Sequence, residues 1–218
     1  MTVFLKQDNY WIEYIPKKNL IFVIVPGAGT YSNKNEYTRL KTHFNLVYFG
    51  ERGSKYDRYP NNWYDNKLVS DRGDHLGGLS FEILKYITGT GDIPSAIICG
   101  SRGGQVTIGK VWYSIWRGPT IIINAGCLTT QTEIPIGVKP LFITMKHDYF
   151  TSVNSQSKVK SLFEKLNKNK AEKGIFIHLP NEAHMPIFKN NLKNLLLDCV
   201  MYLLNYTEKI ENKSIEIS

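Results

Sequence analysis

Three side chains that could form a hydrolytic site follow one another along the chain: a serine, an aspartate and a histidine. Ser101 lies between an apolar stretch at 96–99 and a helical pattern at 105–116. A serine in a tight strand-to-helix turn needs small residues two positions before and after it, and its hydroxyl then projects above the sheet. Cys99 and Gly103 meet that need, so the segment predicts a nucleophilic serine. A serine that only caps the helix is the alternative.

The two partners that such a serine requires come later in the chain. Asp148 follows an apolar strand pattern at 141–145, and His184 follows another at 175–179. A histidine can accept the hydroxyl proton, and a carboxylate can hold that histidine in the orientation it needs. Because ligands bind beyond the carboxyl ends of parallel strands, we expect Asp148 and His184 to meet Ser101 there. The alternative for Asp148 is a helix cap or a solvated carboxylate.

The elements that must position these residues form a regular pattern. Apolar runs of strand length alternate with amphipathic stretches, which predicts an α/β fold with a mostly parallel central sheet and helices on both faces. A length of 218 residues suits one domain, which we assign to residues 1–206, with a polar tail at 207–218. The expected strands are 2–6, 10–15 (a hairpin with the first), 20–25, 46–49, 96–99, 121–124, 141–145 and 175–179, and the expected helices are 35–43, 75–87, 105–116, 158–170 and 188–204.

With serine, acid and histidine in this order, the sequence resembles the α/β-hydrolase superfamily over about residues 5–204. The resemblance implies that Ser101 is the nucleophile, His184 the general base and then acid, and Asp148 its orienting partner. It also implies an oxyanion hole built from two backbone N–H groups, those of Arg102 and of Ala28. Ala28 stands in the segment Val25-Pro26-Gly27-Ala28-Gly29, where the family often has histidine in place of proline.

Residues 50–75 form a polar and aromatic segment that begins at the expected rim of the site and shows neither helical nor strand periodicity. Such a stretch inside a compact domain is more often functional than idle, and we expect it to cover an anionic or sugar-bearing substrate. A solvated loop held by Arg–Asp pairs is the alternative. Between residues 124 and 139 there is room for about one helical turn, so we expect a minimal cap. The residues expected to contact substrate are Gly27, Arg52, Tyr56, Arg58, Trp63 and Cys127.

Composition limits the partners. The 27 Lys and Arg against 19 Asp and Glu give a net charge of +8, which would suit nucleic acid. The lysines are dispersed and no nucleic-acid motif accompanies them, so we expect no nucleic-acid partner. Three widely spaced cysteines exclude a disulfide framework and a CxxC metal site, and we expect no cofactor and no metal. Without a signal-peptide pattern or an apolar run of roughly 20 residues, we expect a cytoplasmic protein.

The sequence therefore predicts a small serine hydrolase that cleaves a carboxylic ester or thioester of a small molecule through an acyl-enzyme. A peptidase or acyltransferase on the same scaffold, and a catalytically silent relative used for binding, stay open as alternatives, as does the oligomeric state.

Residues 104–110 match the first seven positions of a P-loop. Val111 replaces the Ser or Thr that would bind Mg²⁺, and the glycines fall in a helical pattern, so we expect no nucleotide site.

Overall fold

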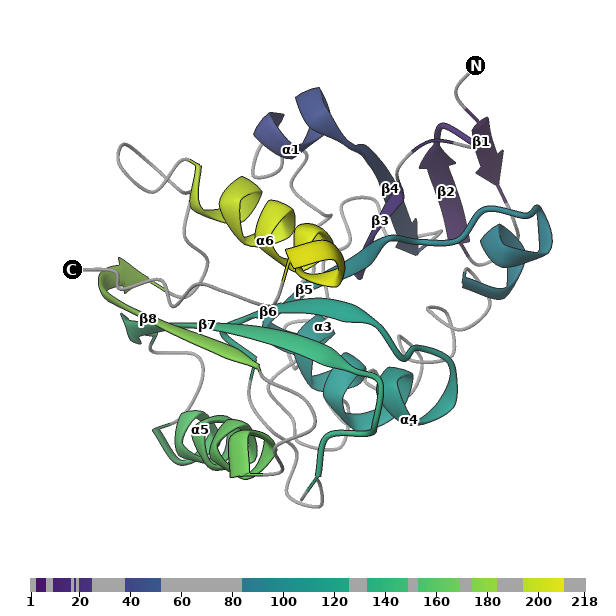
Figure 1. Cartoon of the computed structure of the whole chain (residues 1–218). Coiled ribbons are helices and arrows are strands. Elements are labelled where there is room, and N and C mark those ends of the chain that lie inside the picture. Colours follow the sequence, from purple (N-terminus) through teal and green to yellow (C-terminus); the bar gives the residue numbers. More distant parts are fainter. Residues whose placement is uncertain are drawn as a thin grey trace.

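The computed structural model describes residues 3–6, 10–16, 18, 20–24, 38–51, 84–125, 133–148, 153–168, 174–183 and 194–209. An eight-stranded sheet with the order β1-β2-β4-β3-β5-β6-β7-β8 organises them (Figure 1). The six strands from β4 to β8 in this order run parallel to one another. The strands are β1 (Val3–Lys6), β2 (Tyr10–Tyr14), β3 (Leu20–Ile24), β4 (Asn45–Glu51), β5 (Ala96–Gly100), β6 (Pro119–Ile123), β7 (Lys139–His147) and β8 (Ile175–Ala183).

The first two strands form the hairpin that the sequence predicts. They pair antiparallel, with Val3 opposite Tyr14 and Lys6 opposite Trp11, and β2 in turn pairs antiparallel with β4. The hairpin therefore extends the parallel sheet beyond β4 by two antiparallel strands.

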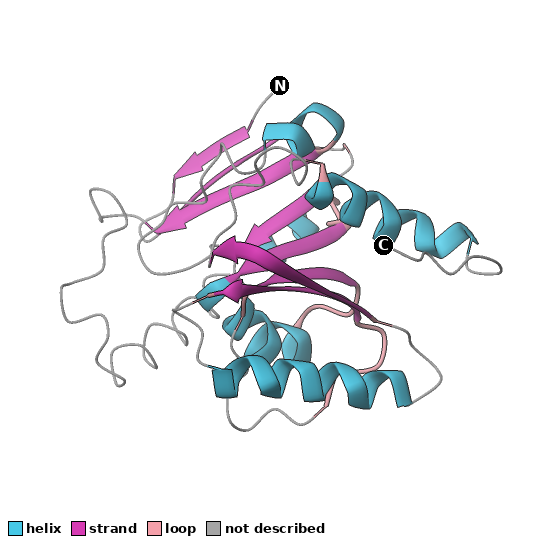
Figure 2. Cartoon of the chain, turned by 90° about the vertical axis from the view of Figure 1, so that its left-hand side faces the viewer, coloured by secondary structure: helices cyan, strands magenta, loops and turns pink. Residues whose placement is uncertain are grey.

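Helices cover both faces of the sheet, which Figure 2 shows as the middle of three layers. Helices α1 (Thr38–His43) and α6 (Leu195–Lys209) lie on one face, and α3 (Ser101–Val106), α4 (Trp112–Ser114) and α5 (Val153–Lys168) lie on the other. A π-helical turn, Thr107–Val111, joins α3 to α4, so that one helical run extends from residue 101 to 114. Residues 84–89 are also helical.

Successive side chains along each strand point to opposite faces of the sheet, which divides the interior into two apolar clusters. Ile97, Ile122 and Phe142 pack with the 84–89 helix, the 101–114 run and α5. Their neighbours in the chain, among them Ile98 and Ile143, pack on the other face with α1 and α6. This two-sided burial explains why the parallel strands are continuous apolar runs in the sequence.

Several elements differ in extent from the sequence-based expectation. The helix after β5 begins at Ser101 rather than at 105. Gly103 and Gly104 have low helix propensity, so the sequence pattern placed the start of the helix after them, although both residues are helical. Strand β8 continues to Ala183 rather than ending at 179. It is an edge strand, where a proline such as Pro180 is tolerated.

The last helix and the fourth strand also differ. Helix α6 begins at Leu195, not at 188, and continues to Lys209, into the first three positions of the expected polar tail. Strand β4 includes residues 50 and 51, which the sequence assigned to the loop.

Among the residues that the structure describes, none of the helices has the length and apolar character needed to cross a membrane.

Candidate active site at the carboxyl ends of the strands

Ser101 stands at the junction between the central strand β5 and helix α3. It is the first residue of the helix, it is half-buried, and its φ is +48°. Positive φ is uncommon for a residue with a side chain and costs energy that the surroundings must supply. The residue before it, Gly100, is extended with φ of −139° and occupies the N-cap position. The tight strand-to-helix turn that the sequence predicts therefore has a strained backbone at the serine itself.

Small residues let the helix pass close to the sheet below Ser101. A Cβ added at Gly104 would overlap the Cβ of Ala125 and lie 3.3 Å from Cγ2 of Ile122. Cys99 is fully buried, and its thiol donates to the carbonyl oxygen of Ile121 at 3.4 Å. The small residues expected at 99 and 103 are both buried, and the structure adds Gly104 as a position where the helix has no room for a side chain against β6 and the residue pair after it.

Burial also affects the chemistry of the nearest thiol. Desolvation raises the pKa of Cys99 to about 12, although a hydrogen bond with Thr107 acts in the opposite direction. A thiol held in its protonated form is a poor nucleophile. Cys99 therefore serves as a small packing residue next to the serine.

Asp148 follows β7 directly, as the sequence predicts. The residue is buried with 6% of its surface exposed, and its Oδ2 is enclosed from solvent. Its backbone N–H donates to the carbonyl oxygen of Met145 at 3.3 Å, closing a turn at the end of the strand. With this burial, Asp148 is not the solvated carboxylate of the alternative interpretation. A buried carboxylate is costly unless polar or charged groups surround it.

The register of the last two strands aligns the ends of β7 and β8. His147 is the Cα partner of Ala183 across the β7–β8 ladder, after an irregularity between Met145 and His147. Asp148 follows His147 in the chain, and His184 follows Ala183. Two adjacent strands thus end side by side, each directly before one of the residues that the sequence predicts to interact.

The sheet also determines where the serine and the carboxylate lie relative to each other. Ser101 follows β5 and Asp148 follows β7, with β6 between them. The register aligns Gly100 with Ile123 of β6, and Ile123 with Ile143 of β7. Strand β7 therefore continues beyond the level at which β5 ends, and both residues lie at the carboxyl edge of the sheet.

Other predicted site residues have different outcomes. Arg102 is the second residue of α3, so its backbone N–H is among the first four of the helix, which lack partners within it. The remaining predicted site residues, together with residues 126–132 of the expected minimal cap and nearly all of the 50–75 segment, lie outside the described residues: Gly27, Ala28, Arg52, Tyr56, Arg58, Trp63, Cys127 and His184.

One residue at this edge was missed by sequence reasoning. Asn124 directly follows β6, is buried with 2% of its surface exposed, and has a φ of +46°. Its side chain contacts β7 at Met145. The available signal was an asparagine immediately after an apolar strand, since asparagine tolerates left-handed backbone better than other residues with a side chain.

One further expectation can be compared with the structure. The glycines of the P-loop-like segment, Gly104 and Gly109, lie in the helical run and not in a phosphate-binding loop, as expected. His178 lies in β8 and is exposed. Its Nδ1 lies 3.1 Å from the hydroxyl of Thr144.

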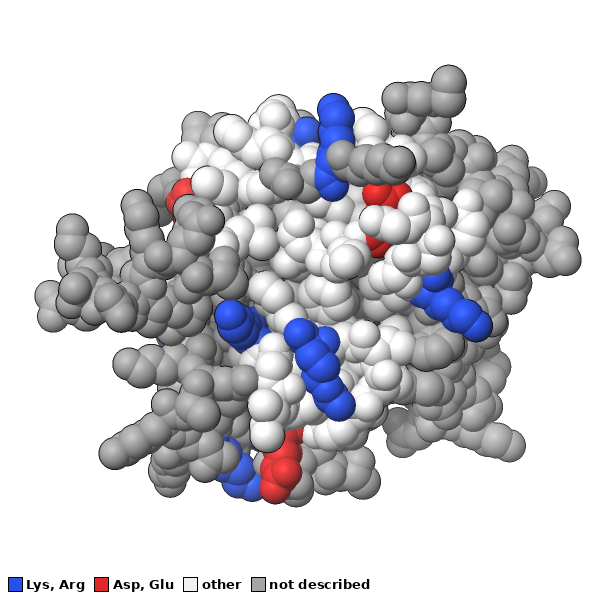
Figure 3. All heavy atoms as spheres, turned by 45° about the vertical axis from the view of Figure 1, so that its right-hand side comes forward, with Lys and Arg blue, Asp and Glu red and all other residues white. Residues whose placement is uncertain are grey.

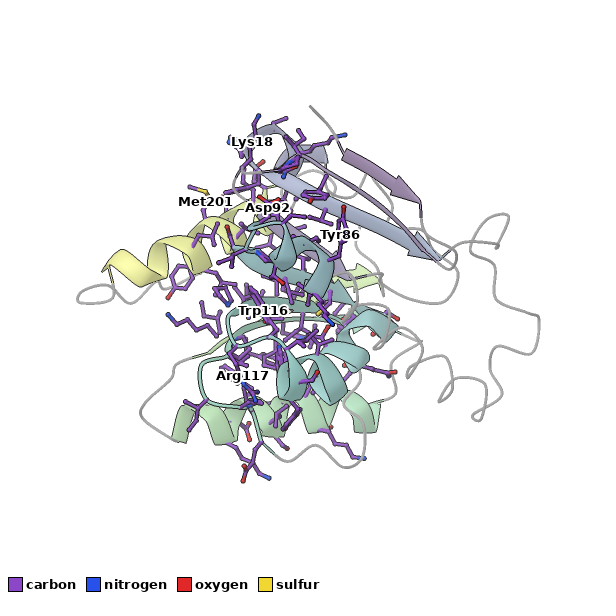
Figure 4. All side chains as sticks on the ribbon, turned by 90° about the vertical axis from the view of Figure 1, so that its right-hand side faces the viewer. Lys18, Tyr86, Asp92, Trp116, Arg117 and Met201 are labelled. Atoms are coloured by element: carbon purple, nitrogen blue, oxygen red, sulfur yellow. The ribbon has the colours of Figure 1, made fainter. Side chains whose placement is uncertain are left out.

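A groove of about 870 Å³ lies at the opposite, amino-terminal edge of the sheet, where it is lined by residues that include Lys18, Lys41, His43 and Asp92. Figure 4 shows Lys18 and Asp92 on this side, in the segments that precede β3 and β5.

On the face in Figure 3, the described lysines and arginines are scattered among uncharged side chains. Within the described ranges, no group of three or more His, Cys, Asp or Glu residues could hold a metal ion.

No family model and no curated protein sequence matches the chain. Solved structures do. An α/β serine hydrolase homologue from Coxiella burnetii is 14% identical, with a TM-score of 0.63, over 93% of this chain and 97% of that one. XC6422 from Xanthomonas campestris, described as an α/β serine hydrolase without a lid, is 13% identical, with a TM-score of 0.64, over 94% of this chain and 92% of that one.

The Francisella virulence factor BioJ is a third such structure. It is 11% identical, with a TM-score of 0.60, over 94% of this chain and 84% of that one. These likenesses extend over nearly the whole chain, and they agree with the sheet order and the two helical layers. The protein has the α/β-hydrolase fold.

Proposed function

We propose that the protein is a serine hydrolase that cleaves a carboxylic ester or thioester through an acyl-enzyme intermediate. The observation that carries the proposal is the positive φ of Ser101 at the β5–α3 junction. Backbone strain of this kind persists only where the surrounding structure maintains it, and it clusters at functional sites. Capping does not account for Ser101, since Gly100 occupies the N-cap position and Ser101 is already inside the helix.

In the proposed reaction, Oγ of Ser101 attacks the carbonyl carbon while its proton passes to His184. Backbone N–H groups of Arg102 and Ala28 donate to the oxyanion that forms. His184 then gives its proton to the alkoxide or thiolate, which departs. Water repeats the two steps on the acyl-enzyme, releases the acid and restores the serine hydroxyl. Asp148 orients His184 and stabilises its positive charge.

Two further observations support this assignment. Asp148 is buried at the same edge of the sheet as Ser101, where a carboxylate can stabilise a neighbouring imidazolium. The β7–β8 register brings Ala183, the residue before His184, next to His147, the residue before Asp148. A peptidase or acyltransferase would use the same groups, and the acyl acceptor distinguishes them.

Covalent labelling with a fluorophosphonate tests the proposal. Its phosphorus is attacked by an activated serine, fluoride leaves, and intact mass spectrometry records one stable phosphonyl adduct. We expect wild type to take up one adduct and Ser101→Ala to take up none. Ser114→Ala is the matched control, because Ser114 is an exposed serine at the far end of the same helical run. It should label like wild type.

The same experiment distinguishes the alternatives. Labelling that persists in Ser101→Ala would place the nucleophile elsewhere. A folded wild-type protein that takes up no adduct would favour the catalytically silent binding protein. If labelling succeeds, hydrolysis of short-chain nitrophenyl esters, acyl thioesters and aminoacyl amides, compared at equal enzyme concentration, identifies the preferred leaving group.

A further inference from the structure

Asn124 connects the end of β6 to the end of β7. Its backbone N–H donates to the carbonyl oxygen of Ile143 at 2.8 Å, which continues the ladder one residue beyond β6. Its side-chain Oδ1 accepts from the backbone N–H of Met145 at 2.9 Å, and its Nδ2 donates to the sulfur of the same residue. With φ of +46°, the backbone turns away from the sheet while the carboxamide stays directed toward β7.

Met145 in turn forms a backbone hydrogen bond with Asp148. The N–H of Asp148 donates to the carbonyl oxygen of Met145 at 3.3 Å. The regular β7–β8 register is interrupted between Met145 and His147, so the ladder alone fixes this stretch less firmly than the strand before it. The asparagine contact lies directly before the irregularity, at the point where the acid-bearing turn begins.

The burial of the contact makes it a firm one. Met145 is fully buried, and Asn124 is 2% exposed, so water does not replace a lost hydrogen bond at the Met145 N–H without rearrangement. Strain at Asn124 and a buried carboxamide are both unfavourable unless the resulting contacts compensate. The hydrogen bonds of Asn124 with β7 contribute to that compensation.

We propose that Asn124 is a positioning residue: its carboxamide fixes Met145, and through Met145 it fixes the turn that presents Asp148 to the histidine. The inference rests on the proposed function for its catalytic meaning. Asn124 itself does not touch the reacting atoms in this scheme. It determines where the carboxylate lies, and thereby how well the base is oriented.

Asn124→Gly tests the inference, because glycine accepts a positive φ without strain and removes only the side chain. Backbone amide exchange by NMR is the first measurement. We expect exchange at Met145 and Asp148 to accelerate about tenfold or more relative to Leu141, at the other end of β7. Unchanged relative protection of both amides would overturn the inference, whatever the activity of the protein.

The second measurement is the fluorophosphonate labelling rate as a function of pH. A carboxylate beside an imidazole raises the pKa of the imidazole, so a displaced Asp148 lets the acid limb of the profile move to lower pH. The plateau rate should also fall, by between about ten- and a hundredfold, as the base loses its orientation. An unshifted limb with an unchanged plateau would show that Asn124 has only a structural role.

Thr120→Val is the matched control in the same strand. Thr120 lies at the amino end of β6, is fully buried, and accepts hydrogen bonds from the indoles of Trp112 and Trp116. This variant should lower stability without shifting the pH limb or selectively exposing Met145 and Asp148. A wild-type protein that takes up no label would refute the proposed function alone, since the exchange measurement still decides whether Asn124 holds the turn.

Discussion

Two aspartates are buried in the described part of the chain, and they lie at opposite edges of the sheet. Asp148 follows β7 at the carboxyl edge, whereas Asp92 precedes β5 at the amino edge and accepts a hydrogen bond from the Thr90 hydroxyl at 3.0 Å. Burial by itself is common to both, so it does not identify the catalytic acid. Their position relative to Ser101 separates them, since only Asp148 lies at the same edge of the sheet as Ser101.

Asp148→Asn should leave the fold intact and reduce the labelling rate by about 10³- to 10⁴-fold. The amide keeps the shape of the carboxylate but no longer stabilises the imidazolium or selects its tautomer. Asp92→Asn removes an equally buried charge and should change the labelling rate by less than about twofold. Rates of fluorophosphonate labelling at pH 8 measure both. Similar losses in the two variants would mean that Asp148 acts through stability rather than chemistry.

At the scale of elements, the position of Ser101 depends on how closely the 101–114 helical run approaches β6. Gly104 provides that approach, because its missing Cβ leaves room for Ala125 directly after the strand. Thr107, the first residue of the π-helical turn, donates its hydroxyl hydrogen to the carbonyl oxygen of Gly103 at 2.8 Å. The backbone around the serine is therefore determined by packing between two elements and not by the serine alone.

Gly104→Ala should lower the free energy of unfolding by about 1–3 kcal/mol, the usual cost of overpacking, and should also slow labelling of Ser101. Gly89→Ala is its control: no atom outside its own helix lies within 4 Å of the added Cβ, so stability should stay the same or rise by up to about 1 kcal/mol. Urea unfolding followed by circular dichroism measures both variants. Equal stability of the two would show that α3 can move away from β6 freely.

In the part of the chain that the structure describes, one sheet lies between two apolar clusters, and each cluster contains a buried cysteine. Cys99 lies in the cluster with α5, and Cys199 lies in the cluster with α6. Burial raises the pKa of each thiol to about 12. Because both clusters share the same strands, we expect them to unfold in one transition, so that ionisation of either thiol affects the stability of the entire molecule.

The alkaline stability of the protein should therefore fall as the pH rises. In the unfolded chain a thiol ionises near pH 8.5, whereas in the folded protein it keeps its proton until about pH 12. The unfolded state thus binds fewer protons above about pH 8.5, and the free energy of unfolding decreases with pH in this window. Between pH 8 and pH 10 each thiol should contribute a loss of about 1–2 kcal/mol.

Cys99→Ala and Cys199→Ala each remove one of these contributions. Urea unfolding at pH 8 and at pH 10 should show a smaller pH-dependent loss in each variant than in wild type, although each variant is less stable overall because of the cavity it creates. Identical pH dependence in wild type and both variants would mean that neither thiol titrates differently in the folded protein.

The order of strands and helices could be predicted from the sequence because apolar periodicity is a local property. The eight strands at 3–6, 10–14, 20–24, 45–51, 96–100, 119–123, 139–147 and 175–183 all fall on expected segments. Errors occur at their ends. Continuation of β8 to Ala183 depends on β7, its neighbour, and a sequence window around Pro180 contains no information about that partner.

The sequence by itself determined a serine between an apolar strand and a helix, and an aspartate directly after another strand, because both are set by residues within a few positions. Only the tertiary structure decided that Asp148 is buried, that Ala183 lies beside His147, and that Asn124 holds β7. These contacts join residues about 20 to 36 positions apart in the chain. Strand pairing brings them together once the sheet has formed, and local periodicity does not encode such contacts.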